Sequence, residues 1–394
     1  MSRAGRFVQQ VEGYRAFLPE PLPPNPPIHF SPELIRLLSR ADQCMARLDG
    51  VTSTLPNPNL FVAMYVRQEA VLSSQIEGTQ STLEDVLQFE IDPLGEELPL
   101  DVEEVVNYIA AMNHGLNRLT ELPLSLRLIR EIHGVLLQGT RGGEKTPGDF
   151  RRSQNWIGPY GCTLKNASFV PPPVHFMNDA LTNLEKFLHD PELPTLIQCG
   201  LAHAQFETIH PFLDGNGRIG RLLITLLLCT SGVLQRPLLY LSYFLKQNRQ
   251  EYYDRLTAIR QNGDWEAWLT FFLRGVAEVS QEATDSARRI LALRDDHTRL
   301  IRNEHKINST HGLKLLDYLY EHPITTVRLV EKHLEVSYAT ANKVIQQFAE
   351  RDLLRESTGY ERNRRFAYDP YLTIFHAETD FTTNEPPAQT TESP

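Results

Sequence analysis

The residues best suited to chemistry lie together in one twelve-residue stretch, HPFLDGNGRIGR, which runs from His210 to Arg221. His210 titrates near neutral pH and can take a proton from a hydroxyl group. Asp214 offers the hard carboxylate oxygen that Mg²⁺ prefers together with phosphate oxygens. Arg218 and Arg221 are three residues apart, so on a helix they share a face, and two guanidinium groups there suit a chain of phosphates. The stretch therefore predicts a site for a phosphate-containing ligand.

A glycine-rich turn and an apolar helix must position these side chains. Gly215, Asn216 and Gly217 form the turn, because glycine readily adopts positive φ. A helix that begins near Arg218 and continues through LLITLLLC adds unpaired N–H donors and the positive end of its dipole. The apolar run is too short for a membrane span, so we expect a buried core helix. A histidine, a GNG turn or two arginines usually have structural roles when alone; their combination within twelve residues favours an anion site.

Length and composition limit the class of protein. The chain has 394 residues and is 41% hydrophobic, which suits two or three globular domains. Its net charge of −10 disfavours a protein that coats nucleic acid, although a local basic patch stays open. Cys44, Cys162, Cys199 and Cys229 lack CxxC spacing and indicate reduced thiols rather than a zinc site. The beginning of the chain, MSRAGRFVQQVEG, lacks the apolar segment of a signal peptide, so we expect a cytoplasmic protein.

Most of the chain has helical periodicity. A proline-rich arm over 17–31 is expected to be extended, and Ser31 is expected to cap the first helix. Helices continue to about residue 140, most clearly over 60–78, where Gly78 stands at a helix end. The runs NWIGPYGC and NASFVPPP predict a β-hairpin. The helical pattern returns at Val174 and continues to about residue 305.

The segment 308–372 has a different pattern, with three short helices, Ser337 as the cap of the third, and strand–turn–strand character around Gly359. This order is typical of a winged helix-turn-helix. The charge of the segment is nearly balanced, so the affinity of a monomer for DNA phosphates would be modest. The segment therefore either binds DNA or serves as a protein-interaction or dimerisation module. The tail over 373–394 is polar and acidic, so we expect it to be disordered. The candidate DNA contacts are Lys343, Arg362, Arg364 and Arg365.

The stretch HPFLDGNGRIGR resembles the signature of the Fic family, HPFx(D/E)GNGRxxR, and matches every specified position. The resemblance implies transfer of AMP from ATP to a Ser, Thr or Tyr hydroxyl of a target protein or of the chain itself, with release of pyrophosphate. It implies that His210 is the general base, that Asp214 binds Mg²⁺ and that Phe212 anchors the loop in the core. Arg218 and Arg221 would hold the β- and γ-phosphates. The implied ATP contacts are Glu77, Asp214, Gly215, Asn216, Gly217, Arg218, Gly220, Arg221 and Tyr252.

Two further segments resemble the family. The predicted hairpin that ends in ASFVPPP resembles the Fic flap, which pairs with an extended segment of the target by strand addition. The stretch NRQEYYDRL, residues 248–256, resembles the helix beside the adenine and carries Tyr252. The alternatives are an ordinary surface hairpin and tyrosines that pack a helix. The flap residues are Asn166, Ala167, Ser168 and Phe169.

SSQIEG, residues 73–78, resembles the inhibitory motif of the family, (S/T)xxxE(G/N), with Ser73, Glu77 and Gly78 at the specified positions. The resemblance implies that Glu77 pairs with Arg221, which then cannot hold the γ-phosphate. Ser73 and Glu77 are one helical turn apart and share a face. A solvated glutamate on a helix is the ordinary alternative. Some relatives use this glutamate to remove AMP, and that activity stays open.

The residues and the resemblance together predict a mainly α protein, with a helical Fic core, a β-hairpin flap and a C-terminal winged helix-turn-helix. We expect ATP and Mg²⁺ as cofactors. The expected partners are a target protein along the flap, DNA at the winged helix and a second copy of the chain in a homodimer, with no membrane.

The alternatives are a DNA-binding regulator whose Fic core senses nucleotide, transfer of UMP or phosphocholine, and removal of AMP. Gly217 before Arg218 differs from the phosphorylating Doc relatives. The expected segments are an N-terminal arm and helical region over 1–110, a catalytic core over 111–280, a helical linker over 281–307, the winged helix-turn-helix over 308–372 and the tail over 373–394.

Overall fold

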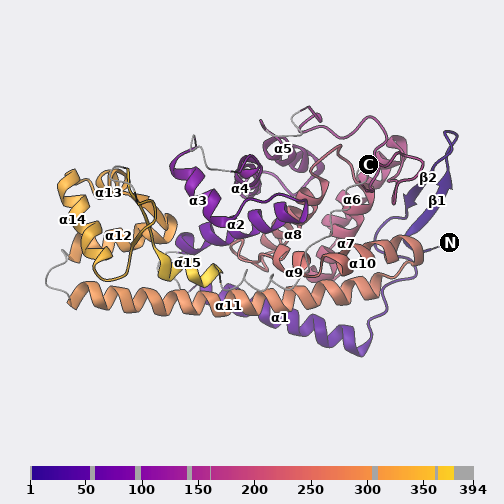
Figure 1. Cartoon of the computed structure of the whole chain (residues 1–394). Helices are drawn as coiled ribbons and strands as arrows, with labels where there is room; N and C mark the ends of the chain where they lie inside the picture. The colour runs from indigo at the N-terminus through magenta and orange to yellow at the C-terminus, as the bar shows by residue number, and fades with distance from the viewer. Residues whose placement is uncertain are drawn as a thin grey trace, which may run out of the picture. The chain divides into compact units, whose positions relative to one another are not determined.

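The computed structural model describes residues 2–53, 58–93, 99–139, 144–159, 161–303, 309–359 and 363–376. The chain divides into two units. Residues 1–54, 62–89 and 94–284 form the first unit, and residues 55–61, 90–93 and 285–394 form the second. The long helix α11 (Trp265–Asn303) continues from the first unit into the second without a break (Figure 1).

The first unit is built almost entirely from helices, which Figure 1 labels in chain order. Besides the beginning of α11, it contains α1 (Pro32–Ser53), α2 (Pro58–Ile76), α3 (Leu83–Ile91), α4 (Val102–Arg118), α5 (Leu126–Leu136), α6 (Val174–Leu188), α7 (Thr195–Ile209), α8 (Asn216–Thr230), α9 (Ser242–Gln247) and α10 (Arg249–Asn262), of which α2 and α3 each have a few residues in the second unit. Ser31 caps α1, because its hydroxyl accepts the Leu34 N–H at 3.2 Å, as predicted. The predicted helix over 60–78 is α2, and Gly78 follows it with φ 105°.

The packed pair α7 and α8 forms the centre of this unit. Every residue of α7 except Thr195 is buried, as expected for a helix with apolar or small residues on all sides. Two of its buried polar side chains have backbone partners: Gln198 donates to Phe187 O at 2.7 Å, and Gln205 donates to Glu20 O at 2.9 Å. The second of these bonds fastens the N-terminal arm to the core. The two helices thus give the loop between them a rigid support.

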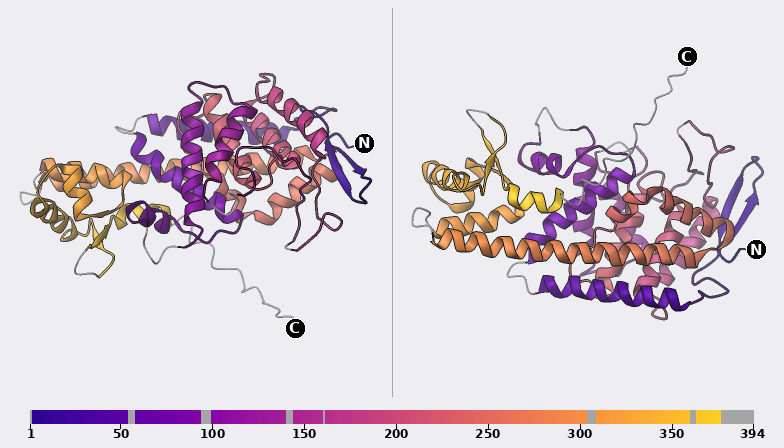
Figure 2. Two further views of the ribbon diagram at one scale, coloured as in Figure 1. Left: turned by 90° about the horizontal axis from the view of Figure 1, so that it is seen from above. Right: turned by 60° about the horizontal axis from the view of Figure 1, so that its bottom comes forward.

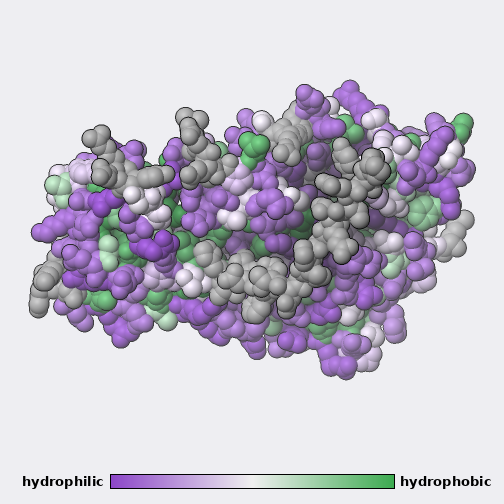
Figure 3. Space-filling model, viewed as in Figure 1, coloured by the Kyte–Doolittle hydropathy of each residue, from purple (hydrophilic) through white to green (hydrophobic). Residues whose placement is uncertain are grey.

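Helices α1 and α11 run beside each other along one side of the first unit (Figure 2). Ser280 Oγ on α11 lies 2.9 Å from Met45 Sδ on α1, and both residues are buried. The face of the molecule in Figure 3 is mostly hydrophilic, and green apolar residues show mainly in its recesses.

An N-terminal hairpin that the sequence pattern did not predict pairs β1 (Gly5–Gln9) with β2 (Arg15–Pro19) in antiparallel register. Phe7 and Phe17 face each other across it with ring centroids 5.0 Å apart. The Phe17 N–H donates to Val170 O at 2.9 Å, so β2 also reaches the segment after the predicted flap. Two five-residue strands without an Asn-Gly turn carry too weak a signal for prediction.

The β-hairpin predicted from residues 155–162 and 166–173 is present in a shorter form than those two runs suggest. A single bridge joins Ile157 and Phe169, which exchange two backbone hydrogen bonds of 2.8 and 3.0 Å. The described residues of this segment contain no β-strand, and Tyr160 lies outside the described residues. Prolines at 171–173 lack the N–H that a longer ladder needs, which limits the pairing.

The second unit contains the element order expected for a winged helix-turn-helix. Ser337 caps its third helix, because the Ser337 hydroxyl accepts the Thr340 N–H at 3.3 Å. Its sheet has the strand order β3-β5-β4 and is antiparallel. Strand β3 was not predicted. The elements are the end of α11, α12 (Ser309–Glu321), β3 (Ile324–Thr326), α13 (Val327–Leu334), α14 (Tyr338–Ala349), β4 (Arg355–Glu356), β5 (Arg365–Ala367) and α15 (Asp369–His376).

The prediction that disorder begins at residue 373 is wrong, because α15 continues to His376. Its aromatic side chains hold it in place. Tyr371 and Tyr320 pack edge to face at 4.8 Å, Phe375 packs on Tyr371 at 5.4 Å, and all three residues are buried. Residues 377–394 lie outside the described part of the chain, so disorder there stays a prediction, as do the proposed domain limits.

Candidate active site

The loop between α7 and α8 is closed by a reciprocal pair of hydrogen bonds. Asn216 Oδ1 accepts the Phe212 N–H at 2.8 Å, and Asn216 Nδ2 donates to Phe212 O at 2.9 Å. His210 ends α7 with φ 48°, and Gly215 precedes α8 with φ 72°, so both residues take left-handed conformations. The first N–H groups of α8 have no partner within the helix, an arrangement that suits an anion; anion binding here stays a prediction.

Phe212 anchors the loop as predicted, and His133 on α5 is its main partner. The two rings stack with centroids 3.7 Å apart and an interplanar angle of 7°, and Phe212 is fully buried. His133 Nδ1 accepts the Gly148 N–H at 2.9 Å, so the other nitrogen, Nε2, carries the hydrogen and donates to Asp214 O at 3.1 Å. Burial lowers the pKa of His133 to about 4, which keeps this tautomer neutral.

Arg151 and Asn155 hold the turn at His210 by its backbone. Arg151 donates from Nε to His210 O at 3.0 Å and from Nη2 to Pro172 O at 2.6 Å. Asn155 Nδ2 donates to His210 O at 3.1 Å and to Phe212 O at 2.8 Å. Arg151 is 1% exposed, and burial lowers its pKa to about 10. No sequence pattern indicates these two residues, because both lie in an irregular segment.

The His210 side chain is poised to accept a proton. Burial and, to a smaller extent, the Arg260 guanidinium lower its pKa to about 4. The imidazole is therefore neutral at pH 7, which is the form that a general base needs. Its Nδ1 lies 4.0 Å from Glu207 Oε2 and has no hydrogen-bond partner among the described residues.

Arg221 lies against the end of α2, where the predicted inhibitory motif lies. Its Nε donates to Ser73 Oγ at 2.8 Å, and its Nη2 donates to Ser73 O at 2.9 Å and to Glu77 Oε1 at 2.7 Å. Burial opposes ionisation of Glu77, but Arg221 outweighs burial and holds the pKa of Glu77 below its ordinary value. Helix α2 ends at Ile76, so Glu77 lies just beyond the helix rather than on it. The predicted contact between Glu77 and Arg221 is present.

Glu69, one turn before Ser73, fixes α2 to its neighbours and was not found from the sequence. Its carboxylate accepts the Ser242 N–H at 3.1 Å, the Ser242 hydroxyl at 2.5 Å and the Tyr108 hydroxyl at 3.3 Å. Burial raises the pKa of Glu69 to about 7, although the Ser242 bonds and Arg221 favour its ionised form. These bonds join α2 to α9 and α4 and so set the position of Glu77.

Arg218 pairs with a different acid from the Glu77 that pairs with Arg221, although the two arginines share the predicted helix face. Its Nη1 donates to Glu104 Oε2 on α4 at 3.2 Å, and its Nη2 lies 3.7 Å from Asp214 Oδ1. Arg218 is 5% exposed. Glu104 is more than a hundred residues away in the sequence, and only the fold brings it here. Each predicted phosphate-binding arginine therefore lies beside a carboxylate.

Of the predicted flap residues, Phe169 is the one that reaches the site. Its ring lies under the Arg260 guanidinium, 3.9 Å from the ring centroid. Asn166 bonds within its own turn, where its Oδ1 accepts the Thr163 N–H at 2.6 Å. Ala167 is half-buried and packs against the buried residues Tyr14, Ala16 and Val170. Ser168 is exposed.

Tyr252 on α10 is 1% exposed, and its hydroxyl pairs with His203 Nε2 at 2.9 Å. The neighbouring Tyr253 is 39% exposed. The Tyr252 hydroxyl thus already has a protein partner. Contact of Tyr252 with adenine stays a prediction.

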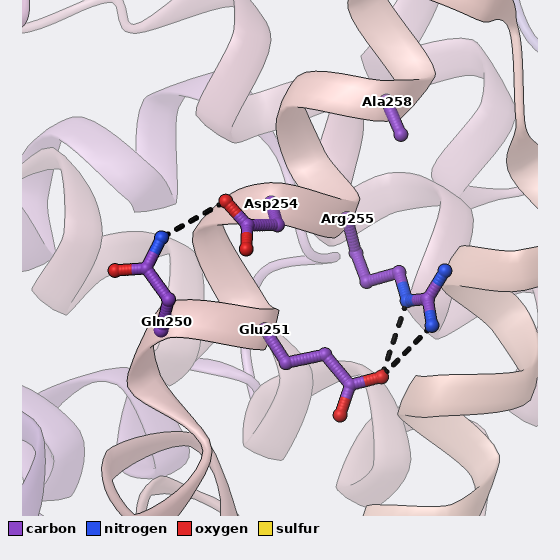
Figure 4. Close-up of a pocket in the computed structure, with 5 residues that line it drawn as sticks. All are labelled: Gln250, Glu251, Asp254, Arg255 and Ala258. Atoms are coloured by element: carbon purple, nitrogen blue, oxygen red, sulfur yellow. Dashed lines mark hydrogen bonds and ion pairs between the residues drawn. The ribbon is translucent and has the colours of Figure 1, made fainter.

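An open hollow of about 520 Å³ lies on the outer face of α10 (Figure 4). The polar and charged side chains that line it form hydrogen bonds and ion pairs with their neighbours. Glu251 accepts from Arg255 at 3.0 Å and from Arg274 at 2.8 Å, and Gln250 donates to Asp254 at 2.9 Å. The hollow does not include any residue of the His210 loop, and we assign no ligand to it.

Of the four candidate DNA contacts, three lie in the described part of the second unit. Lys343 is exposed on α14, and Arg364 Nη2 donates to Asn342 Oδ1 at 3.4 Å. Arg365 on β5 forms an ion pair of 3.0 Å with Asp92. Arg362 lies outside the described residues. Of the three described residues of this set, Lys343 is the exposed one, and Arg364 and Arg365 are half-buried.

Known protein families match most of the first unit. The Fic/DOC family pattern matches residues 123–228, and the pattern described as Fic/DOC family N-terminal matches residues 35–117. The chain belongs to the Fic/DOC family. The solved structure of a Fic family protein from Desulfovibrio desulfuricans G20 has a TM-score of 0.57 and 20% identity, and covers 87% of this chain and 97% of that one. The predicted mainly α Fic fold is confirmed.

Curated relatives carry an activity in their names. The protein adenylyltransferase Fic of Drosophila virilis is 30% identical over 216 residues, which is 52% of this chain and 38% of that protein. The protein of the same name from Aedes aegypti is 30% identical over 168 residues, 41% of this chain and 29% of that protein. The matches thus span less than half of the length of these relatives. Within the described ranges, no helix combines the length and apolar character needed to cross a bilayer.

Proposed function

We propose that this protein transfers AMP from ATP to a hydroxyl side chain of a protein. The observation that carries the proposal is a neutral His210, with a side chain that is 18% exposed, beside the free N-terminus of α8 in a loop held by Asn216 and Phe212. A base next to an anion site suits attack of a hydroxyl on a phosphate. The names of the fly and mosquito relatives support the same reaction.

The proposed reaction proceeds at the α-phosphorus. The target hydroxyl oxygen bonds to that phosphorus while the bond to the bridging β-phosphate oxygen breaks, and pyrophosphate leaves. His210 takes the hydroxyl proton. The N–H groups at the start of α8 stabilise the charge on the phosphate, and Arg221 receives the terminal phosphate once Glu77 withdraws. Catalysis here is mainly positioning and charge neutralisation.

Asp214 is the residue that would hold Mg²⁺. Its side chain is 44% exposed beside the start of α8, and Mg²⁺ commonly takes one or two carboxylates plus phosphate oxygens. The described residues contain no group of three His, Cys, Asp or Glu side chains that could bind a metal without a ligand. The donor set therefore fits an ion that arrives with ATP. When bound, Mg²⁺ neutralises phosphate charge.

Glu77 makes the proposed enzyme self-inhibited. Its carboxylate takes one of the hydrogen bonds of Arg221, and it also fills the space above Gly217, since a Cβ built there would lie 2.1 Å from Glu77 Oε1. A γ-phosphate and Glu77 would compete for Arg221. Removal of AMP by the same site is the alternative direction of this chemistry, and labelled product lost on incubation without ATP would reveal it.

The test is His210→Ala in a Glu77→Gly background, incubated with ATP labelled at the α-phosphate. We expect label on protein with Glu77→Gly alone and none with the double variant. Label that persists without His210 would exclude its role as base.

For the second unit we propose a partner-binding role, with duplex DNA as the first ligand to test. The order of its elements and the exposed Lys343 on α14 support this proposal. Lys343→Glu should weaken DNA binding that falls steeply with salt. Absence of salt-dependent binding would favour a protein partner, including a second copy of this chain.

A further inference from the structure

Glu207 is a second buried acid in the active site that no part of the proposed reaction uses. It lies on the last turn of α7, three residues before His210, and is 7% exposed. Its Oε1 has no hydrogen-bond partner among the described residues. A buried polar atom without a hydrogen bond destabilises the folded chain, so such a carboxylate calls for a functional reason.

The side chain of His210, the proposed base, faces the Glu207 carboxylate. Glu207 Oε2 lies 4.0 Å from His210 Nδ1, and that nitrogen forms no hydrogen bond of ordinary geometry in the described part of the chain, although the Glu207 backbone oxygen faces the imidazole and raises its pKa. A movement of about 1 Å would bring the two atoms to hydrogen-bond distance. Such contacts are often long in the absence of substrate and shorten when the reacting complex forms.

The surroundings hold Glu207 in this place. Arg260 donates to the Glu207 backbone oxygen at 3.2 Å and to Thr208 Oγ1 at 3.3 Å, which fixes this turn of α7. On the other side, α8 presents Gly220, and a Cβ built there would lie 2.5 Å from Glu207 Oε1. Any larger residue at that position would push the carboxylate away, so Gly220 has a role beyond the phosphate loop.

We propose that Glu207 is a positioning residue for His210, whose carboxylate accepts the Nδ1–H and leaves Nε2 as the nitrogen that takes the hydroxyl proton. This inference rests on the proposed AMP transfer. The carboxylate also stabilises the positive imidazolium that forms during the step, as an acid does for the histidine of a Ser-His-Asp triad. The proton moves from the hydroxyl to Nε2, and Glu207 itself gains none.

The protonation of Glu207 decides whether His210 can act. An ionised carboxylate accepts from Nδ1–H, whereas a protonated one would donate to Nδ1 and leave the hydrogen on Nε2, where it blocks the base. Burial raises the pKa of Glu207 to about 7; Arg221 lowers this pKa, Glu77 raises it and Arg260 lowers it. Removal of Glu77 therefore favours the ionised form and couples the inhibitory contact to the base. The charged and titratable groups that face Glu207 are Arg221, Glu77, Arg260, His210, Tyr252 and Tyr253.

The first test reads the imidazole directly and does not depend on activity. Nitrogen NMR of ¹⁵N-histidine-labelled protein, assigned with His210→Ala, should show His210 with its hydrogen on Nδ1 at pH 8 and a change of tautomer as the pH falls through the titration of Glu207. Glu77→Gly should move that change to lower pH. A His210 signal with the hydrogen on Nε2 at pH 8, or one unaffected by Glu207→Gln, would overturn the proposal.

The second test is kinetic and uses Glu77→Gly as the parent. Adding Glu207→Gln should lower the rate of AMP transfer about tenfold or more, with the KM for ATP nearly unchanged, and should remove the rising limb of the pH profile near neutrality. Gly220→Ala should displace the same carboxylate and reproduce the loss if Glu207→Gln does not fold. Glu84→Gln, at an exposed position on α3, is the matched control and should retain the parent rate. Unchanged rates in both variants would refute the proposal, whereas an inactive parent would refute AMP transfer and leave the NMR result to decide on Glu207.

Discussion

Replacing Glu77 with glycine is expected to free Arg221 for the terminal phosphate of ATP and so to raise transfer of AMP. The ion pair is short, 2.7 Å from Nη2 to Oε1, but its two sides differ in exposure. The Arg221 side chain is 2% exposed and that of Glu77 is 40% exposed, so solvent screens the pair in part. The hydrogen bonds that Arg221 donates to Ser73 remain in the variant and keep Arg221 in place.

The size of the effect follows from that exposure. Fully exposed pairs contribute about 0.2–1 kcal/mol, and loss of one partner of a buried pair costs about 3–5 kcal/mol. The half-exposed pair here lies between them, at about 1–2 kcal/mol. That free energy, if all of it opposes the γ-phosphate, corresponds to a gain of about 5- to 30-fold in productive ATP binding.

The assay is auto-modification with α-labelled ATP at a concentration below KM, together with the dissociation constant for ATP from calorimetry. Glu77→Gln should give a smaller gain, because an amide oxygen can still accept from Arg221. Glu84→Gln should behave as wild type. A Glu77→Gly variant that binds ATP as wild type does and transfers no more AMP would refute the account of Arg221 as a shared residue.

Three further outcomes are expected. Glu104→Gln leaves Arg218 buried with Asp214 as its remaining acid, so the free energy of unfolding should fall by about 1–3 kcal/mol in urea while ATP binds more tightly; a variant as stable as wild type would contradict the pairing. Asp214→Asn should weaken activation by Mg²⁺ about tenfold or more, measured as transfer against metal concentration with Asp254→Asn as the control; an unchanged metal dependence would exclude this ligand. His203 has a folded pKa lowered to about 4 by burial, whereas the unfolded residue titrates near 6.5, so the unfolded chain binds more protons between these values and stability should be lost as the pH falls from about 6.5 to 4. His203→Gln should flatten that loss in urea unfolding, and an equal slope in both proteins would show that His203 does not contribute.

The local part of the site could be predicted because its residues are adjacent in the chain. The motif places a base and an acid on one loop and two arginines at the beginning of the helix that follows it, and the turn chemistry of Gly215 and Asn216 requires little beyond the loop itself. The contact between Glu77 and Arg221 bridges 144 residues, and only the family resemblance indicated it. Physical periodicity alone would have left Glu77 as a solvated glutamate.

The rest of the site depends on the fold. Glu104, Arg151 and Glu207 have no sequence pattern that separates them from surface charges, and each acquires its role through burial against a distant element. Arg151 is buried and forms no ion pair with any described residue; it donates to backbone oxygens instead, which no spacing rule could indicate. Strand pairs of two to five residues, as at β1 and β4, fall below what alternation can detect.

The most direct test of the proposed activity is to compare ATP labelled at the α-phosphate with ATP labelled at the γ-phosphate, using Glu77→Gly protein in cell lysate, and to identify the modified residues by mass spectrometry. The account predicts label from the α-position only, carried as AMP on a Ser, Thr or Tyr hydroxyl, and none when His210 is also replaced by alanine. Label from the γ-position, or AMP transfer that survives the loss of His210, would contradict it.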